Sequence, residues 1–211
     1  MAGEPHVSSN VGGGTKLPEP CRDGKTTVEA ALGRRQSVRE FNREALTLAE
    51  VSQLLWAAQG MTSSAGRRTV PSAGALYPLE VFLVSGKEDV LPAGVYRYRP
   101  LAHELVRVAE GDKRAQLATA ALEQEWLKEA PVTLVIAAVY ERTARKYRQR
   151  AERYVHMEVG HAAQNVHLQA AALGLGTVVV GAFGDAQVKR VLTLAANEDP
   201  LCLMPVGNPR T

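Results

Sequence analysis

The chain has 211 residues, of which 45% are hydrophobic, 22% charged and 5% aromatic. This length predicts one globular domain whose core needs no disulfide or structural metal. The formal net charge of +3 is too small to indicate nucleic-acid binding without a recognition module, and no uncharged apolar run approaches membrane-spanning length. The start lacks the features of a signal peptide, and Cys21 and Cys202 lack metal or redox spacing, so we expect a cytoplasmic protein.

Residues 1–25 are rich in Gly, Pro, Ser and Asn, which predicts a flexible N-terminal arm ahead of a folded domain at 26–211. Apolar periodicity and capping signals then predict helices over 28–36 and 47–60, strands over 79–85, 95–99 and 104–108, a helix over 112–128, a strand over 132–139, a helix over 152–173, a strand over 177–180, a helix from 185 and a strand over 201–206. Helices and strands mix without strict β-α-β alternation, which indicates an α+β fold.

Two of these segments have features that suggest function. Residues 61–78 are mostly small and show little apolar periodicity, and so long a loop in a compact domain is more often functional than idle. The helix over 152–173 carries a broad stripe of small and apolar residues, which is typical either of a core helix or of a helix at the centre of a subunit interface.

Three short motifs resemble ligand sites but lack what those sites require. Gly12–Lys16 is glycine-rich like a phosphate loop, yet no strand precedes it. Gly174-Leu-Gly176 follows a helix instead of a strand, so it predicts a helix C-cap and not a dinucleotide site. Glu158-x-x-His161 is one half of a di-iron motif without its second half, so we expect His156 and His161 to be polar helix residues and no metal site.

Two guanidinium groups and a hydroxyl recur at alternate positions in Arg35, Ser37 and Arg39. In an extended segment all three side chains point to one side. The planar donors and permanent charge of arginine suit a phosphate, or an anion that develops on a heterocycle. The alternative is a set of surface charges after a helix.

Two loops complete the set of candidate motifs. The loop from Pro71 to Pro78 has small side chains that would let backbone amides approach a flat ligand. The turn from Val180 to Phe183 follows a buried strand, so its N–H groups would either donate to a ring nitrogen or cap the next helix.

In this order the motifs resemble the FMN-dependent nitroreductase superfamily, and its SagB-type dehydrogenase branch in particular. The resemblance covers residues 28–208 and rests on Arg-x-Ser-x-Arg-x-Phe, Pro-Ser-Ala-Gly-Ala-Leu-Tyr-Pro, Gly-His-Ala-Ala-Gln-Asn and Leu-Gly-Leu-Gly-Thr-x-x-x-Gly-Ala-Phe. It implies a nitroreductase-like α+β fold with a mostly antiparallel central sheet flanked by helices. It also implies a homodimer with the long helix and two FMN sites at the subunit interface.

By this resemblance, Arg35 and Ser37 would meet the flavin phosphate and ribityl chain. Arg39 would face the N1/O2 edge of the isoalloxazine, where a cation stabilises the reduced flavin. Arg210 is the nearby basic residue for the phosphate.

The resemblance assigns the two loops as well. The backbone of Gly181 and Ala182 would lie near flavin N5, the atom that accepts hydride. The partner subunit would contribute a short run of small residues, namely Pro71, Ser72, Ala73 and Gly74.

Lys146 and Tyr147 resemble the Lys-Tyr pair that azoline-oxidising members use near the flavin. A lysine with a lowered pKa could remove a proton while the flavin takes a hydride. The alternative places Lys146 on a solvated basic helix face, where the azoline role fails.

The primary hypothesis is therefore an FMN oxidoreductase that exchanges hydride in a ping-pong cycle. NADH, NADPH or a ring substrate such as a thiazoline or oxazoline would donate, and a nitroarene, a quinone or dioxygen would accept. The alternatives are an azoline dehydrogenase that forms thiazole or oxazole rings in a peptide, and a non-catalytic flavin-binding or peptide-binding scaffold subunit. Tyr77, Trp126 and Tyr147 remain open as further lining residues.

Overall fold

The computed structural model describes residues 13–42, 44–86 and 91–210. A seven-stranded sheet has the order β1-β4-β3-β2-β5-β7-β6, and each of its neighbouring pairs is antiparallel. The strands are β1 (Thr15–Lys16), β2 (Leu79–Ser85), β3 (Gly94–Arg99), β4 (Glu104–Glu110), β5 (Val132–Ala138), β6 (Gly176–Thr177) and β7 (Asp199–Gly207).

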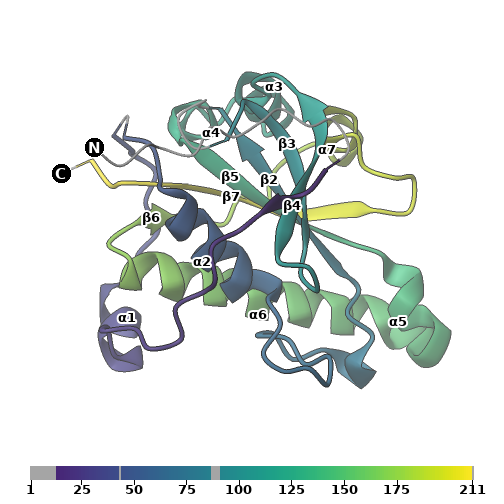
Figure 1. The fold of residues 1–211 in the computed structure, drawn as a ribbon. Helices are drawn as coiled ribbons and strands as arrows, with labels where there is room; N and C mark the ends of the chain where they lie inside the picture. The colour runs from purple at the N-terminus through teal and green to yellow at the C-terminus, as the bar shows by residue number, and fades with distance from the viewer. Residues whose placement is uncertain (1–12, 43, 87–90, 211) are drawn as a thin grey trace.

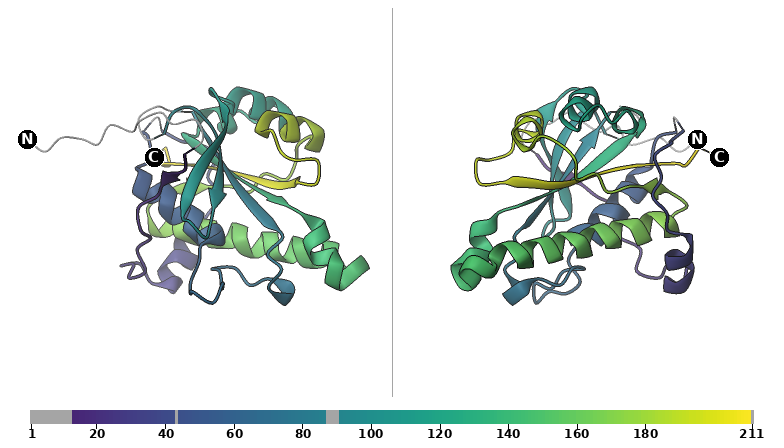
Figure 2. Two further views of the ribbon diagram at one scale, coloured as in Figure 1. Left: turned by 45° about the vertical axis from the view of Figure 1, so that its right-hand side comes forward. Right: turned by 180° about the vertical axis from the view of Figure 1, so that it is seen from behind.

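Helices cover both faces of this sheet (Figures 1 and 2). The helices are α1 (Val28–Arg34), α2 (Leu48–Gln59), α3 (Arg114–Ala120), α4 (Trp126–Glu129), α5 (Tyr140–Tyr147), α6 (Ala151–Ala172) and α7 (Asp185–Leu192), with 3-10 turns η1 (Ala73–Ala75) and η2 (Arg148–Arg150). In Figure 1 the helices α1, α2, α5 and α6 lie below the sheet, and α3, α4 and α7 lie above it. Within the described ranges, none of the helices is both long and apolar enough to cross a membrane.

The period of two along the central strands divides the core into two layers. In β2, Val81 and Leu83 join the cluster that packs on α2 and α6, whereas Phe82 and Val84 join the cluster under α3 and α7. Every residue of β5 is buried, as the continuous β-branched run at 132–139 predicts for a strand covered on both faces. The predicted α+β class with an antiparallel sheet flanked by helices is confirmed.

Several helix ends confirm the sequence signals. Thr27 caps α1 through a hydrogen bond from Ala30 N, and Thr47 with Glu50 forms the predicted capping box of α2. At the end of α6, Gly174 has φ +76°, and its N–H and that of the next residue bond back to carbonyls in the last turn. This is the glycine C-cap that the sequence predicts.

The single helix predicted over 112–128 is wrong. The structure has α3 and α4 instead, separated by a turn in which Leu122 and Glu123 adopt left-handed φ values of 58° and 59°. Leu117 and Leu127 are both fully buried in one cluster. In a continuous helix, ten residues would place these two side chains about 80° apart around the axis, so the break lets both reach the core.

The segment that the sequence predicts as an N-terminal arm is described from residue 13 onward. There β1 pairs with β4, and Leu17 is buried. The Pro18 carbonyl accepts a hydrogen bond from Ser52 Oγ. Residues 15–18 therefore pack on the domain, and residues 1–12 lie outside the described part of the chain.

Candidate functional site

The segment that carries the predicted arginine fork lies at the edge of the sheet beside β6. Ser37 forms a parallel bridge with Thr177, and Val38 N donates to the Thr177 carbonyl at 3.0 Å. A Cβ at Gly176 would lie 2.6 Å from Val38 Cβ, so this approach requires glycine. Phe41 is buried and bridges to Pro209, which fixes the far end. The segment is extended, as the alternating pattern requires.

The three side chains of the fork are partly or fully exposed. Arg39 lies with its Cζ 5.8 Å from the Trp126 ring centroid in α4, whereas Arg35 lies near His167 in α6. Within the described residues, the side chains of Arg35, Ser37 and Arg39 make no hydrogen bond or ion pair. They are therefore unpaired in the described chain, which leaves open both a binding role and the alternative of surface charges.

The turn after β6 lies close to this segment. Val180 N donates to the Leu203 carbonyl at 2.8 Å, and Gln124 Nε2 donates to the Ala182 carbonyl at 3.0 Å. Gly181 and Ala182 are exposed, and their N–H groups have no acceptor among the described residues. Because α7 begins only at Asp185, these amides do not cap it.

Arg210 also reaches the fork segment, but its guanidinium is occupied. Its backbone N–H donates to the Glu40 carbonyl, and its Nη2 donates to the Phe41 carbonyl, each at 3.0 Å. The same nitrogen lies 3.5 Å from a carboxylate oxygen of Glu129. Within one chain, Arg210 therefore binds the backbone and an acid.

The second predicted loop has a strained and well-held backbone. Gly74, Ala75 and Tyr77 all have positive φ, at 64°, 54° and 45°. Ser72 accepts hydrogen bonds from Ala75 N through its carbonyl and from Tyr77 N through its hydroxyl. Arg142 Nη1 donates to the Tyr77 carbonyl at 3.0 Å. Left-handed non-glycine residues persist only where surrounding contacts hold them, and such strain is frequent at functional sites.

The structure brings Lys146 and Tyr147 of α5 to this loop. A Cβ on Gly74 would lie 3.0 Å from Tyr147 Oη and 3.2 Å from Lys146 Nζ. Tyr147 also packs edge-on against Tyr154 at 4.9 Å between ring centroids. Lys146 is exposed in the single chain. The predicted catalytic pair and the predicted loop thus form one cluster.

Glu158 is a buried acid beneath that loop which sequence reasoning did not assign. It is 3% exposed, and its Oε1 has no hydrogen-bond partner among the described residues. Burial raises the pKa of Glu158 to about 7, against the smaller opposite effects of the Ser72 hydroxyl and the Arg68 charge. The only sequence signal was an acid within a stripe of small and apolar residues.

The two clusters lie at different ends of α6. We call Arg35, Ser37, Arg39, Gly181 and Ala182 the fork end, and Pro71–Tyr77 with Lys146, Tyr147 and Glu158 the loop end. In Figures 1 and 2, α1 and β6 flank one end of α6 and α5 flanks the other. Trp126 lies at the fork end, and Tyr77 and Tyr147 lie at the loop end. In the part of the chain that the structure describes, no group of three or more His, Cys, Asp or Glu could hold a metal ion.

Known proteins resemble this chain in sequence. The sequence profile of the Nitroreductase family matches residues 32–208. A protein of Methanocaldococcus jannaschii named as a candidate nitroreductase is 51% identical over 184 residues, which is 85% of this chain and 90% of the relative. The microcin B17-processing protein McbC of Escherichia coli is 35% identical over 133 residues, or 61% of this chain and 49% of McbC.

Solved structures resemble it as well. A candidate nitroreductase from Ralstonia eutropha JMP134 superposes with a TM-score of 0.84 at 30% identity, over 97% of this chain and 93% of that one. A chain of the Escherichia coli microcin synthetase McbBCD, solved with truncated pro-MccB17 bound, superposes with a TM-score of 0.76 at 28% identity. The match covers 84% of this chain and 70% of that chain. The McbC relationship agrees with the predicted SagB-type branch. The chain belongs to the nitroreductase family of flavin-type oxidoreductases.

Proposed function

We propose that this protein is an FMN-dependent oxidoreductase that works as a homodimer with a ping-pong cycle. Bound FMN would supply the redox chemistry, by taking a hydride at N5 from one substrate and passing it to a second. The observation that carries the proposal is the fork end. Two arginines, a serine hydroxyl and two backbone amides on the segments beside β6 have no hydrogen-bond partner in the described chain.

These donors fit the groups that FMN presents. Arg35 and Ser37 would bind the phosphate and ribityl chain, and the permanent charge of Arg39 would face the pyrimidine edge. The Gly181 and Ala182 amides, which point to no protein acceptor, would bind near N5. Arg210 would assist at the phosphate only by leaving Glu129.

A second copy of the chain is needed to complete this site. Ser72 at the loop end is close to Glu158, and Arg35 at the fork end is close to His167. In α6, His167 follows Glu158 by nine residues. That spacing is about 13 Å along the axis at 1.5 Å per residue. Two-fold pairing of α6 with its copy would place the loop end of one subunit against the fork end of the other.

The outer face of α6 suits such a pairing. Met157 is 58% exposed, His161 and Gln164 are exposed, and a Cβ at Gly160 would meet nothing within 4 Å. A small residue in the middle of an exposed helix face allows close approach of a second helix. Pro71, Ser72, Ala73 and Gly74 would then reach the partner's flavin.

The contact between Lys146 and Gly74 favours a second candidate, oxidation of an azoline ring in a peptide. McbC, a relative of this chain, is named for processing microcin B17. Lys146 would take the ring proton, with Tyr147 beside it, while the hydride leaves to the flavin. Because Lys146 is exposed in one chain, this role requires the second subunit or the substrate to cover it.

The first test is the visible absorption spectrum of the purified protein, followed by anaerobic addition of NADH or NADPH. Flavin bands that bleach on addition would support a nicotinamide-driven oxidoreductase. Flavin bands that persist would favour the azoline dehydrogenase or a non-catalytic flavin-binding subunit. Oxidation of a synthetic azoline peptide would then distinguish the dehydrogenase from the non-catalytic subunit. A protein that takes up no flavin, even after incubation with FMN, would overturn the proposal.

A further inference from the structure

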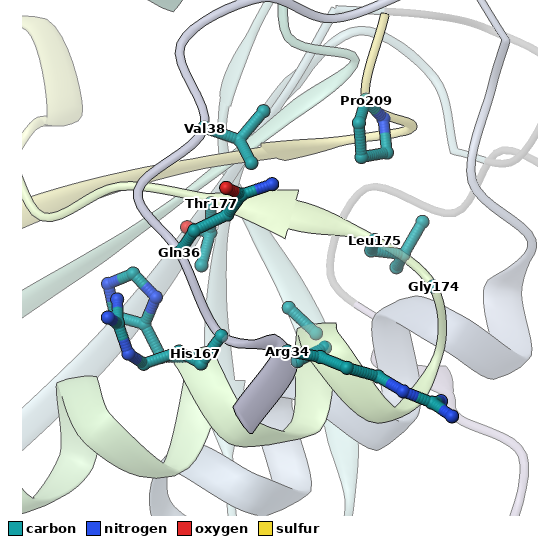
Figure 3. A pocket seen from close by; sticks show the side chains of 11 residues that line it. Arg34, Gln36, Val38, His167, Gly174, Leu175, Thr177 and Pro209 are labelled. Atoms are coloured by element: carbon teal, nitrogen blue, oxygen red, sulfur yellow. The ribbon is translucent and has the colours of Figure 1, made fainter. Parts of the chain in front are cut away.

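The turn of residues 181–184 lies between β6 and α7 in the chain. It does not line the pocket of about 230 Å³ that Figure 3 shows, where His167 and Thr177 lie on one side. That pocket belongs to the region that the proposed function already gives to FMN through Arg35. The turn is a separate feature, because it offers backbone donors and contains no charged side chain.

Backbone hydrogen bonds anchor this turn at both of its ends. Val180 N donates to the Leu203 carbonyl at 2.8 Å, and Leu203 N donates to the Val180 carbonyl at 3.0 Å. At the other end, Gly184 N donates to the Ala120 carbonyl at 2.8 Å. Between these anchors, the N–H groups of residues 181–183 have no acceptor in the described part of the chain. Backbone hydrogen bonds therefore do not fix the orientation of the middle of the turn.

The side chain of Gln124 supplies the contact that the middle of the turn lacks. Its Nε2 donates to the Ala182 carbonyl at 3.0 Å and to the Ala121 carbonyl at 2.8 Å. Both acceptors are carbonyl oxygens, so each proton of the side-chain amide has its own partner. Ala121 directly follows α3. Gln124 thus ties the turn to the helix end that also accepts the bond from Gly184.

A strained bend brings Gln124 to this position. Leu122 and Glu123 adopt left-handed φ values of 58° and 59°. Burial of these two side chains does not hold the bend, because both are exposed. The hydrogen bond from Gln124 to the Ala121 carbonyl closes across it. Left-handed non-glycine residues persist only where contacts hold them, and they are frequent at functional sites.

The peptide between Ala182 and Phe183 turns the contact with Gln124 into an orientation. This peptide is trans, so its C=O and its N–H point in opposite directions. Because the C=O points to Gln124, the Phe183 N–H points away from Gln124. The Phe183 side chain packs against the core cluster under α3 and α7. The residue is therefore held through its ring and its preceding carbonyl, while its N–H stays unpaired in the described chain.

We propose that Gln124 is a positioning residue that orients the N–H groups of Ala182 and Phe183 toward the flavin ring. The inference rests on the proposed function and adds the group that holds these donors in place. A donor that is already ordered binds a ring nitrogen without a further loss of conformational freedom. Glutamine suits this role because its neutral amide donates to two carbonyls at once.

The central variant is Gln124→Met, which keeps the length of the side chain and removes both donors. Gln116→Met is the matched control, because Gln116 is an exposed glutamine of α3 that makes no hydrogen bond to the described residues. NMR relaxation of the flavin-free protein measures the backbone order parameters of residues 181–183. We expect values of about 0.85 in the parent and the control, and a fall toward about 0.6 in Gln124→Met.

Flavin binding provides the second readout. Riboflavin, which has the flavin ring without the phosphate, should bind roughly tenfold more weakly to Gln124→Met. N5 accepts a hydrogen bond in the oxidised ring and carries its own proton after reduction, so the variant should lose more affinity for oxidised flavin. A tenfold difference raises the midpoint potential of bound FMN by about 30 mV. A role in fold stability alone would leave this potential unchanged.

Gln124→Glu is a second variant of the same length, since an ionised carboxylate at pH 8 has no proton to donate. It should act in the same direction as Gln124→Met, with Gln116→Glu as its control. Unchanged order parameters in both Gln124 variants would overturn the inference, whether or not flavin binds. Lower order parameters with an unchanged potential would make Gln124 a structural contact only, which overturns it as well. A parent protein that takes up no flavin would overturn the proposed function, and the order parameters alone would then decide whether Gln124 holds the turn.

Discussion

The fork end and the loop end differ in how many of their polar groups form hydrogen bonds within the described chain. At the fork end, the side chains of Arg35 and Arg39 make no polar contact within the described chain. At the loop end, hydrogen bonds from Tyr77 N to Ser72 and from Arg142 to Tyr77 hold a strained backbone. One end therefore leaves these two side chains unpaired, whereas the other uses its own contacts to hold a shape.

The largest effect is expected at the loop end, from Glu158→Gln. The pKa of Glu158 is about 7 in the fold, against an ordinary value of 4.5. Between these two pH values the unfolded chain binds fewer protons than the fold, so the free energy of unfolding falls as pH rises. Above pH 7 the loss is roughly 3 kcal/mol. Glu158→Gln should remove this dependence of the unfolding free energy on pH. The unfolding free energies of the variant and the parent should therefore differ most at pH 8 and least near pH 4.

Denaturant unfolding across that pH range measures the effect. Glu152→Gln is the matched control, because it changes the same charge at an exposed position of α6. Parallel curves for Glu158→Gln and the parent would contradict the assigned ionisation.

At the fork end, Arg39→Ala should weaken FMN retention by roughly tenfold to a hundredfold, because a charged hydrogen-bonding group is lost. Stability should change by less than about 1 kcal/mol, since the side chain makes only a long contact with Trp126. Flavin content after purification and the FMN dissociation constant measure the loss. Normal flavin occupancy with unchanged reduction by NADH or NADPH would show that Arg39 has another role.

Gly74→Ala tests how tightly the loop end is held. A methyl group there meets positive φ and lies close to Lys146 and Tyr147, so we expect a loss of about 1–3 kcal/mol in stability. Gly66→Ala separates the two causes, because Gly66 has φ +84° but open space around its Cβ. Equal losses in thermal unfolding would mean that the contact with α5 contributes nothing.

The smallest effect is expected for Arg210→Leu. The variant loses the hydrogen bond from Arg210 to the Phe41 carbonyl and the partly exposed ion pair with Glu129. Together these contribute on the order of 1 kcal/mol or less to stability. FMN affinity should fall less than in Arg39→Ala. A larger fall would show that Arg210 leaves Glu129 to bind the phosphate when the ligand is present.

Local signals in the sequence determined much of this fold. Thr27, Thr47 with Glu50, and Gly174 set helix ends because their hydrogen bonds close within a few residues. The β-branched run of β5 predicted burial on both faces for the same local reason. The order of the four motifs identified the family, which the profile match over residues 32–208 confirms.

Only the tertiary structure decided the rest, because it depends on contacts between distant residues. It divided the predicted helix over 112–128 so that two buried leucines share one core, and it paired Arg210 with Glu129. It placed Lys146 beside Gly74, Glu158 beneath Ser72, and His167 with Thr177 in one pocket. No local spacing encodes those juxtapositions, since each joins segments that α6 and the sheet bring together.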